Sequence, residues 1–301
     1  MFPGQGAQFV GMARDLLEQD AAAKQFLKNA EDTLDLPLGR FMLEGPAAEL
    51  QRTENAQPAI VFHSLALLGT LAERGTRADA VAGHSLGEFA GLVAAGGLEP
   101  MDALLAVRAR GQAMAAAAPA SSGMVAVLGL DDATVEAICR GAPGVVPANY
   151  NAPGQVVISG PDDALERVMA RLQQAGARRL VRLPVSAAFH SPLMAKAAET
   201  FAPAWGRIPL GRLDRRQVFN ADAEVHAEPT EVRPLMVGQL TGPVRWTQSV
   251  VRMAELGVDT FVEIGPGKTL SGLVKKILPG AVLHNIDGVA SLNAFLQTVR
   301  A

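Results

Sequence analysis

The sequence predicts a mixed α/β fold in which a large domain with a parallel-sheet core is interrupted by a smaller domain. Short apolar segments alternate with longer helical patterns in the first third of the chain and again after residue 192, as in a sheet covered by helices. The stretch between them has a different order, strand–helix–strand–strand–helix–strand. Hydrophobic residues make up 49% of the 301 positions, so the chain can bury a sizeable core.

The first third of the chain supplies the opening elements of the large domain. Only Met1 and Phe2 precede the Gly-rich turn PGQG, so either the first strand is very short or the start is truncated. Pro58 is expected in the first turn of an apolar helix, where a missing N–H is tolerated. The expected elements are a helix over 58–74, a buried strand over 78–83, and helices over 86–95 and 101–117.

The smaller domain is expected over residues 121–189, and residues 1–120 and 190–301 form the large domain. Acidic residues begin both of its helical patterns, and a Pro-Gly turn joins its two middle strands. Its expected strands are 124–130, 145–150, 155–160 and 178–185, and its expected helices are 131–140 and 161–176. This βαββαβ order is the ferredoxin-like pattern. The Ala-rich stretch 113–123 is the expected hinge.

After the smaller domain, the alternation of helices and strands resumes. The expected helices are 192–205, 229–240, 244–256, 268–277 and 289–300, and the expected strands are 259–265 and 281–285. The order indicates that the large domain is completed by the C-terminal third of the chain.

Charge and cysteine content narrow the functional class. The net charge is −3 and the isoelectric point is near 6.0, which argues against a nucleic-acid binder. The single cysteine, Cys139, excludes an intrachain disulfide and a cysteine-based zinc site and fits a reducing cytoplasm. No uncharged apolar run reaches about 18 residues, so no membrane span is expected.

The stretch VAGHSLGEFAGLVAAGG places Ser85 between Gly83 and Gly87. An apolar strand leads into the turn and a helix leads out of it, which is the setting of the nucleophile elbow in hydrolase-like α/β domains. The helix directs its N-terminal dipole and its free N–H groups at the serine, where they favour developing negative charge. We therefore predict that Ser85 is a nucleophile and that the Leu86 N–H stabilises an oxyanion.

A serine nucleophile needs a general base, and the chain offers five histidines. His63 is expected to be packed within an apolar helix, and His226 is expected to be exposed. The side chain of His84 is expected to point away from the serine. Two candidates remain, His190 in AFHSPLM and His284 near the C-terminus. The chain order of an ordinary α/β-hydrolase triad is matched by Ser85, Asp222 and His284. The residues alone therefore do not decide which of the two histidines is the base.

Seven motifs taken together resemble the malonyl-CoA:acyl carrier protein transacylase family, relatives of the acyltransferase domains of fatty acid and polyketide synthases. The motifs occur in the family's order along nearly the whole chain. They are FPGQGAQ (2–8), GHSLGEFAGLVAAG (83–96), the Arg-Gly-Gln-Ala-Met run (110–114), NYNAPGQVVISG (149–160), AFHSPLM (188–194), the QL and PVRW pair (239–246), and EIGPGKTLSGL (263–273). Such an ordered set is far more specific than any single motif.

The resemblance assigns the catalytic roles. It implies that Ser85 is acylated and that His190 is its base. The third member of the triad is then a backbone carbonyl, that of Gln239, which orients the histidine. The oxyanion hole would use the backbone N–H groups of Gln5 and Leu86, and the glycines of PGQG would allow the close backbone approach.

The resemblance also implies the residues that select the acyl group. Arg110 would hold the free carboxylate of malonyl, since a planar guanidinium can grip a carboxylate with two hydrogen bonds. Phe189 would fill the space that a methylmalonyl branch requires. Met114 and His84 would line the acyl pocket. Arg108, two positions along the helix, is expected to point elsewhere.

The function implied is transfer of malonyl from malonyl-CoA to the phosphopantetheine thiol of holo-acyl carrier protein through a malonyl-serine. No cofactor and no metal are expected, and the enzyme is expected to be a cytoplasmic monomer without nucleic-acid or membrane partners. Candidates for the surface that meets the acidic carrier protein are Lys275, Lys276, Arg178, Arg179 and Arg182. The alternatives are a serine hydrolase or thioesterase and an inactive carrier-binding module.

Three further features are expected to be structural. The 265–267 turn resembles a phosphate loop but has Val262 where that loop needs glycine. It is expected to be structural or to lie near the path of CoA or the carrier. Asn151 and Gln155 are expected to order the hairpin of the smaller domain.

Overall fold

Residues 1 and 2 join two small sheets at the centre of the larger part of the protein. The computed structural model describes residues 1–299. Strand β1 (Ala80–Ala82) pairs in parallel with β6 (Arg216–Val218), which pairs with the antiparallel β7 (Val225–His226). Strand β8 (Thr260–Ile264) pairs in parallel with β9 (Val282–Ile286).

The start of the chain connects these sheets through backbone contacts to both of them. Phe2 forms a parallel bridge with Gly83, and the Met1 carbonyl accepts a hydrogen bond from the Ile264 N–H at 2.9 Å. Met1 and Phe2 thus pair with both sheets, and the chain continues directly into the PGQG turn.

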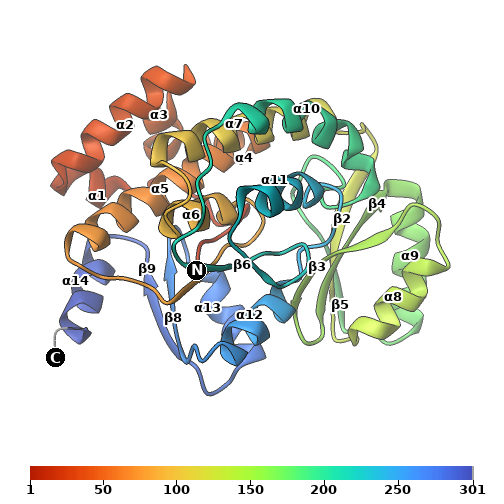
Figure 1. Cartoon of the computed structure of the whole chain (residues 1–301). Helices are drawn as coiled ribbons and strands as arrows, with labels where there is room; N and C mark the ends of the chain where they lie inside the picture. The colour runs from red at the N-terminus through yellow and green to blue at the C-terminus, as the bar shows by residue number, and fades with distance from the viewer. Residues whose placement is uncertain (300–301) are drawn as a thin grey trace.

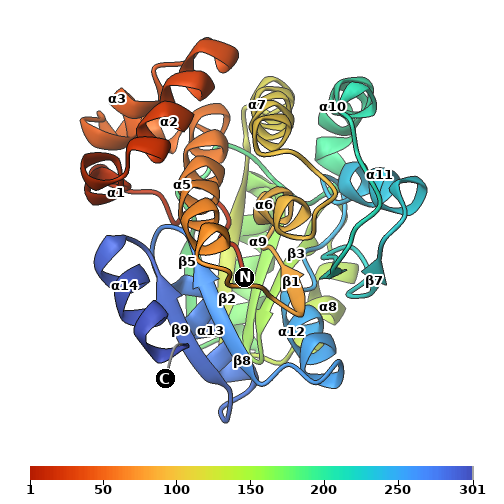
Figure 2. The same cartoon turned by 60° about the vertical axis from the view of Figure 1, so that its left-hand side comes forward.

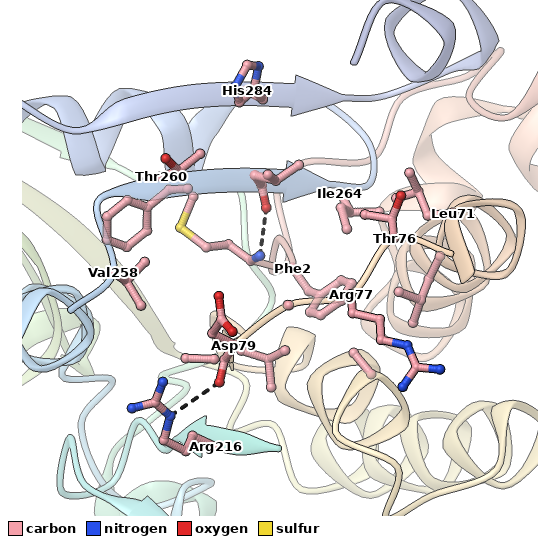
Figure 3. Close-up of a pocket in the computed structure, with 18 of the residues that line it drawn as sticks. Phe2, Leu71, Thr76, Arg77, Asp79, Arg216, Val258, Thr260, Ile264 and His284 are labelled. Carbon is pink, nitrogen blue, oxygen red and sulfur yellow. Dashed lines mark hydrogen bonds between the residues drawn. The ribbon is translucent and has the colours of Figure 1, made fainter. Parts of the chain in front are cut away.

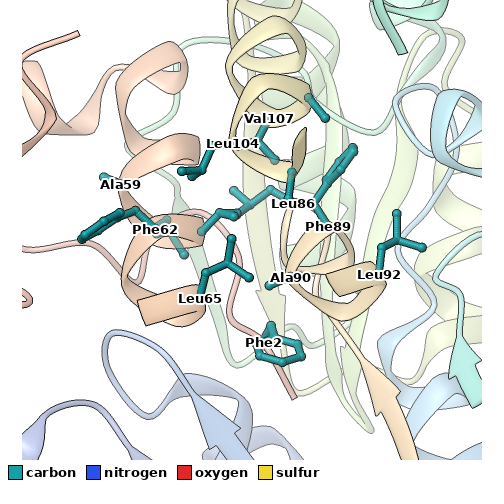
Figure 4. Packing of buried hydrophobic residues seen from close by; sticks show 14 of the residues in the cluster. Phe2, Ala59, Phe62, Leu65, Leu86, Phe89, Ala90, Leu92, Leu104 and Val107 are labelled. Carbon is teal, nitrogen blue, oxygen red and sulfur yellow. The ribbon is translucent and has the colours of Figure 1, made fainter. Parts of the chain in front are cut away.

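Helices cover this central layer and bury its apolar face (Figures 1 and 2). The main ones are α5 (Thr53–Glu73), α6 (Gly87–Ala94), α7 (Pro100–Ala116) and α10 (Ala195–Arg207). Figure 4 shows side chains of α5, α6 and α7, among them Phe62, Phe89 and Leu104, meeting in one apolar cluster. The packing fixes α6, and with it the turn that precedes α6, against the rest of the core.

A separate antiparallel sheet forms the yellow-green part of the molecule in Figure 1. Its strands lie in the order β3 (Val146–Ala152), β4 (Gln155–Pro161), β2 (Ser122–Leu128) and β5 (Arg179–Arg182). Helices α8 (Asp132–Arg140) and α9 (Asp162–Gln174) pack on this sheet and bury a cluster of their own with it. The expected element order of this stretch is confirmed, although β5 is shorter than predicted.

The other elements flank these two parts. They are α1 (Arg14–Gln19), α2 (Ala21–Leu34), α3 (Leu38–Leu43), α4 (Ala47–Gln51), the 3₁₀ turn η1 (Pro192–Met194), α11 (Pro229–Gly238), α12 (Trp246–Glu255), α13 (Thr269–Ile277) and α14 (Val289–Thr298). The helices and strands expected after residue 192 are present, and the expected end of the last helix at residue 300 lies outside the described residues. No helix within residues 1–299 is long and apolar enough to cross a membrane.

Sequence reasoning was wrong about the start of α5 and did not identify α1–α4, β6 or β7. Helix α5 begins at Thr53, so Pro58 lies inside it rather than in its first turn. A proline at this position leaves the carbonyl of Glu54 without its helical donor. Arg108 Nη1 donates to that carbonyl at 2.8 Å, which supplies the missing partner from α7. The N-cap Asp20, whose side chain accepts from two N–H groups of α2, is a signal that could have revealed α2.

We predict that Gly83→Ala destabilises the fold far more than Gly69→Ala. A Cβ at Gly83 would overlap the backbone of Gly87 and Glu88, so either the turn or α6 must move. The expected loss is about 3 kcal/mol or more of unfolding free energy. Gly69→Ala, on an exposed face of α5 with nothing within 4 Å of the added Cβ, is the control, with an expected gain of about 0.5–1 kcal/mol. Urea unfolding of both variants measures the difference, and equal midpoints would contradict it.

Candidate active site

Ser85 lies at the turn between β1 and α6 and has a strained backbone. Its φ is 53°, a left-handed value that costs a non-glycine residue energy and that a nucleophile elbow uses to expose its side chain. A Cβ fits at neither of the two flanking glycines. At Gly83 it would overlap the backbone of Gly87, and at Gly87 it would overlap the Phe2 carbonyl. The local structure is the strand–turn–helix that the sequence predicts.

His190 is brought to Ser85 from the loop after β5. Its Nε2 lies 2.8 Å from Ser85 Oγ, and its Nδ1 lies 2.8 Å from the backbone carbonyl of Gln239. Since a carbonyl only accepts, Nδ1 carries the proton and Nε2 is free to accept the Ser85 hydroxyl proton. Gln239, at the end of α11, thus fixes the tautomer that a general base requires.

Arg110 reaches the same point from α7. Its side chain is 1% exposed. Nη1 donates to Gln57 Oε1 at 2.8 Å, and Nη2 donates to Gln239 Oε1 at 2.8 Å and to Ser85 Oγ at 3.1 Å. Arg108 points elsewhere, as expected, and bonds to α5.

Burial shapes the charges at this site. It lowers the pKa of Arg110 to about 10 against the opposing charge of Glu88, so the guanidinium stays protonated at neutral pH. Burial and, second, the charge of Arg110 lower the pKa of His190 to about 3. The imidazole is therefore neutral and able to take a proton.

The PGQG turn lies beside the elbow in very close backbone contact. A Cβ on Gly4 would come 2.7 Å from the His84 carbonyl oxygen, so the approach depends on glycine. Among residues 1–299, the backbone N–H groups of Gln5 and Leu86 donate to no protein acceptor. They are thus available for an oxyanion, and that role stays a prediction. The Gln5 side chain donates to Thr53 Oγ1 at 3.1 Å.

The remaining predicted pocket residues surround this centre. Met114 Sδ accepts a hydrogen bond from Gln57 Nε2 at 3.4 Å, and the oxygen of the same amide accepts from Arg110. Phe189 is buried next to His190. His84 turns away from Ser85, as expected, and its Nε2 lies 2.9 Å from Asn151 Oδ1. Asn151 therefore links the antiparallel sheet to the elbow as well as belonging to the hairpin.

Sequence reasoning missed three buried polar residues at the site: Gln57, Glu88 and Asn220. Asn220 Oδ1 accepts from the Ser85 N–H at 2.7 Å, and its Nδ2 donates to the Gly83 carbonyl at 2.8 Å. Both carboxylate oxygens of Glu88 accept hydrogen bonds, one from the Asn220 N–H at 2.6 Å and one from Gln239 Nε2. Burial raises the pKa of Glu88, while these two donors and the charge of Arg110 oppose the rise. With a donor on each oxygen, the geometry is that of the ionised carboxylate. The Glu in GHSLGE, polar within an apolar helix, is the one signal in the sequence.

The alternative hydrolase triad is not assembled. Asp222 Oδ2 bonds to His226 Nε2 at 2.8 Å. This pair leaves His226 half-buried rather than exposed, which corrects the sequence expectation. His284 lies on β9 and lines a cavity of about 400 Å³ between β1 and β8 (Figure 3). Ser85 is not among the residues of that cavity, so neither Asp222 nor His284 is paired with the nucleophile.

Two other sequence expectations concern histidine packing and the 265–267 turn. His63 is fully buried in α5, as expected.

Glu263, just before the 265–267 turn, accepts from the N–H groups of Leu270 and Ser271 at the start of α13. A Cβ at Gly265 would come 2.8 Å from the Pro3 ring. The turn therefore holds α13 and packs on the PGQG segment, which is a structural role.

Comparisons with known proteins identify the family to which the chain belongs. Residues 1–282 match the family described as "Acyl transferase domain". The chain is 42% identical to the malonyl CoA-acyl carrier protein transacylase of Bacillus subtilis, over 100% of this chain and 96% of that protein, and 38% identical to that of Escherichia coli K12, over 99% and 98%.

Solved structures are similar over the same length. The malonyl-CoA:acyl carrier protein transacylase of Xanthomonas oryzae superposes with a TM-score of 0.95 at 40% identity and covers 99% of this chain and 96% of its own. The malonyl-transacylase in a solved complex with its type II PKS acyl-carrier protein matches with a TM-score of 0.95 at 36% identity, over 99% of this chain and 98% of its own.

We predict that His190 stays neutral well below the ordinary histidine range. An NMR titration of its imidazole should show no protonation between pH 7 and pH 5, and Arg110→Met, which removes the second cause of the depression, should raise the midpoint. A free histidine protonates near pH 6.5, so unfolding takes up a proton below that pH and this group destabilises the fold as the pH falls from about 6.5. A wild-type midpoint near 6.5 would contradict the assignment.

Proposed function

Since the chain belongs to the acyl transferase family, we propose that it catalyses malonyl transfer from malonyl-CoA to holo-acyl carrier protein through a malonyl-Ser85 intermediate. The enzyme is an acyltransferase that supplies malonyl units for fatty acid or polyketide synthesis. One observation carries the residue assignments: Ser85 Oγ lies within hydrogen-bond distance of both His190 Nε2 and Arg110 Nη2. Nucleophile, base and carboxylate partner therefore meet at one atom.

The first half-reaction acylates Ser85. His190 Nε2 takes the hydroxyl proton as Oγ attacks the thioester carbonyl of malonyl-CoA. The negative charge that develops on the carbonyl oxygen is stabilised by the backbone N–H groups of Gln5 and Leu86. The tetrahedral intermediate then collapses, the C–S bond breaks, and the CoA thiolate receives the proton from His190.

The second half-reaction reverses these steps with another thiol. The phosphopantetheine thiol gives its proton to His190 and attacks the malonyl ester, and the Ser85 oxygen takes the proton back as it leaves. The Gln239 carbonyl keeps the imidazole in one orientation through both halves. Because CoA leaves before the carrier reacts, the kinetics are ping-pong.

Arg110 gives the site its preference for a carboxylated acyl group. In the free enzyme the guanidinium is bonded to the amide oxygens of Gln57 and Gln239, and a malonyl carboxylate is a stronger, charged acceptor. An uncharged acyl group offers no such partner, so it gains nothing from the arginine. Phe189, buried beside His190, narrows the pocket against a branched acyl group.

The acyl carrier protein is the partner of this family, and CoA is the leaving group we assign to the donor. Lys275, Lys276, Arg178 and Arg179 remain candidates for the carrier-binding surface. Arg182 is a weaker one because Asp162 and Glu166 pair with it. A monomeric state, a cytoplasmic location and the lack of a cofactor or metal remain predictions.

The finer description of the fold belongs to the same proposal. We assign the large part to the hydrolase-like α/β class because of its elbow at the carboxyl end of a parallel strand. The strand order β3-β4-β2-β5 with two crossover helices supports a ferredoxin-like class for residues 121–189. Its separate apolar cluster supports the division into 1–120 with 190–301 and 121–189.

Intact-protein mass spectrometry tests the function. The protein is mixed with malonyl-CoA and then with holo-acyl carrier protein. The expected result is one malonyl adduct that maps to Ser85 and moves to the carrier, with no adduct on Ser85→Ala. An adduct that is lost as free malonate at the same rate with and without the carrier would instead indicate a hydrolase. A wild-type protein that binds the carrier but never forms an adduct would indicate a binding module.

A further inference from the structure

We propose that Glu88 is a positioning residue that sets the orientation of the Gln239 side-chain amide and, through it, holds Arg110 ready for the substrate carboxylate. The proposal rests on the malonyl transfer proposed above. It assigns a role to a buried acid that lies three residues after the nucleophile and touches none of the reacting atoms.

Glu88 lies on the first turn of α6 and is 1% exposed. One carboxylate oxygen accepts from the Asn220 N–H at 2.6 Å and the other from Gln239 Nε2. Both oxygens thus face donors, an arrangement that suits the ionised carboxylate, which only accepts. The backbone of α6 and the bond from Asn220 fix where this acceptor points.

The Gln239 amide has only one orientation that satisfies its neighbours. On its nitrogen side lie two acceptors, Glu88 Oε2 and the Ser85 carbonyl, the latter at 3.0 Å. On its oxygen side lies a donor, Arg110 Nη2, at 2.8 Å. Turning the amide over would place its NH₂ against the guanidinium and its oxygen against two acceptors. The carboxylate of Glu88 therefore dictates that an oxygen faces Arg110.

The intervening amide also keeps the arginine exchangeable. A carboxylate in direct contact with Arg110 would form a strong charge-assisted pair and would compete with malonyl for the guanidinium. Separated by Gln239, Glu88 still supplies the opposite charge that a buried cation needs, while Arg110 bonds directly only to neutral oxygens. The arrangement stabilises the charge and leaves its bonding positions to the substrate.

The test compares wild-type protein with Glu88→Gln by measuring kcat/KM for malonyl-CoA and for acetyl-CoA. In the variant, the new amide keeps an oxygen on the Asn220 N–H and turns its NH₂ toward the NH₂ of Gln239. The Gln239 amide must then reverse and present a donor to Arg110. The expected result is a fall of roughly 10- to 100-fold in the ratio of the malonyl to the acetyl value, mostly through a higher KM for malonyl-CoA.

Two reference variants calibrate this ratio. Arg110→Ala gives its value without the guanidinium. Glu263→Gln is a matched control, because Glu263 is also a fully buried acid but bonds to the start of α13 rather than to the active site, and its ratio should equal that of the wild type. A Glu88→Gln ratio equal to the wild type, or an equal loss for both substrates, would overturn the proposal in favour of a purely structural role.

Two other results are also decisive. If Glu88→Gln does not fold, Gln239→Met is used in its place. This variant removes the side-chain amide that lies between Glu88 and Arg110, and it keeps the backbone carbonyl that bonds to His190. The same fall in the ratio supports the proposal, and an unchanged ratio overturns it. If the wild-type protein itself forms no malonyl adduct, the proposed function fails and this inference with it. If the wild type prefers malonyl-CoA and the variant keeps that preference, the role of Glu88 is rejected while the proposed function stands.

Discussion

The buried positive charge of Arg110 is the constraint around which the active site is built. A guanidinium removed from water is strongly destabilising unless its donors find acceptors and its charge finds a counter-charge. The acceptors are oxygens of Gln57, Gln239 and Ser85. The negative charge is that of Glu88, which is separated from Arg110 by the Gln239 amide. Burial is the main cause of the lowered pKa of His190, and the positive charge of Arg110 adds to it. A substrate carboxylate that pairs with Arg110 would relieve that effect, so recognition and reactivity are linked at one side chain.

The second constraint is backbone proximity at the elbow. Glycines at 4, 83 and 87 let the PGQG turn, β1 and α6 approach so closely that a Cβ on any of them would meet backbone atoms. This packing places the PGQG turn, which contains Gln5, directly against the elbow that contains Leu86. Residues far apart in the chain then converge, because Asn220 and Gln239 bond directly to the backbone of Ser85.

The sequence predicts those parts of the protein whose signals are local. The elbow, most helices and strands, and the element order of residues 121–189 follow from glycine, proline and apolar patterns. His190 and Gln239 were identified only by resemblance, because their pairing with Ser85 depends on tertiary contacts between loops. Glu88 and Asn220 were not found, since a buried polar residue within an apolar pattern does not reveal its distant partner. The early start of α5 was missed for the same reason: the donor that makes Pro58 tolerable is Arg108 on another helix.

The central claim is that Arg110 exchanges its amide partners for the carboxylate of the substrate. A crystal structure of the malonyl-Ser85 form, prepared without carrier protein, tests it most directly. We predict two hydrogen bonds from the guanidinium to the malonyl carboxylate, with the His190 Nδ1 still bonded to the Gln239 carbonyl. A malonyl carboxylate that points away while Arg110 keeps its bonds to Gln57 and Gln239 would contradict the claim.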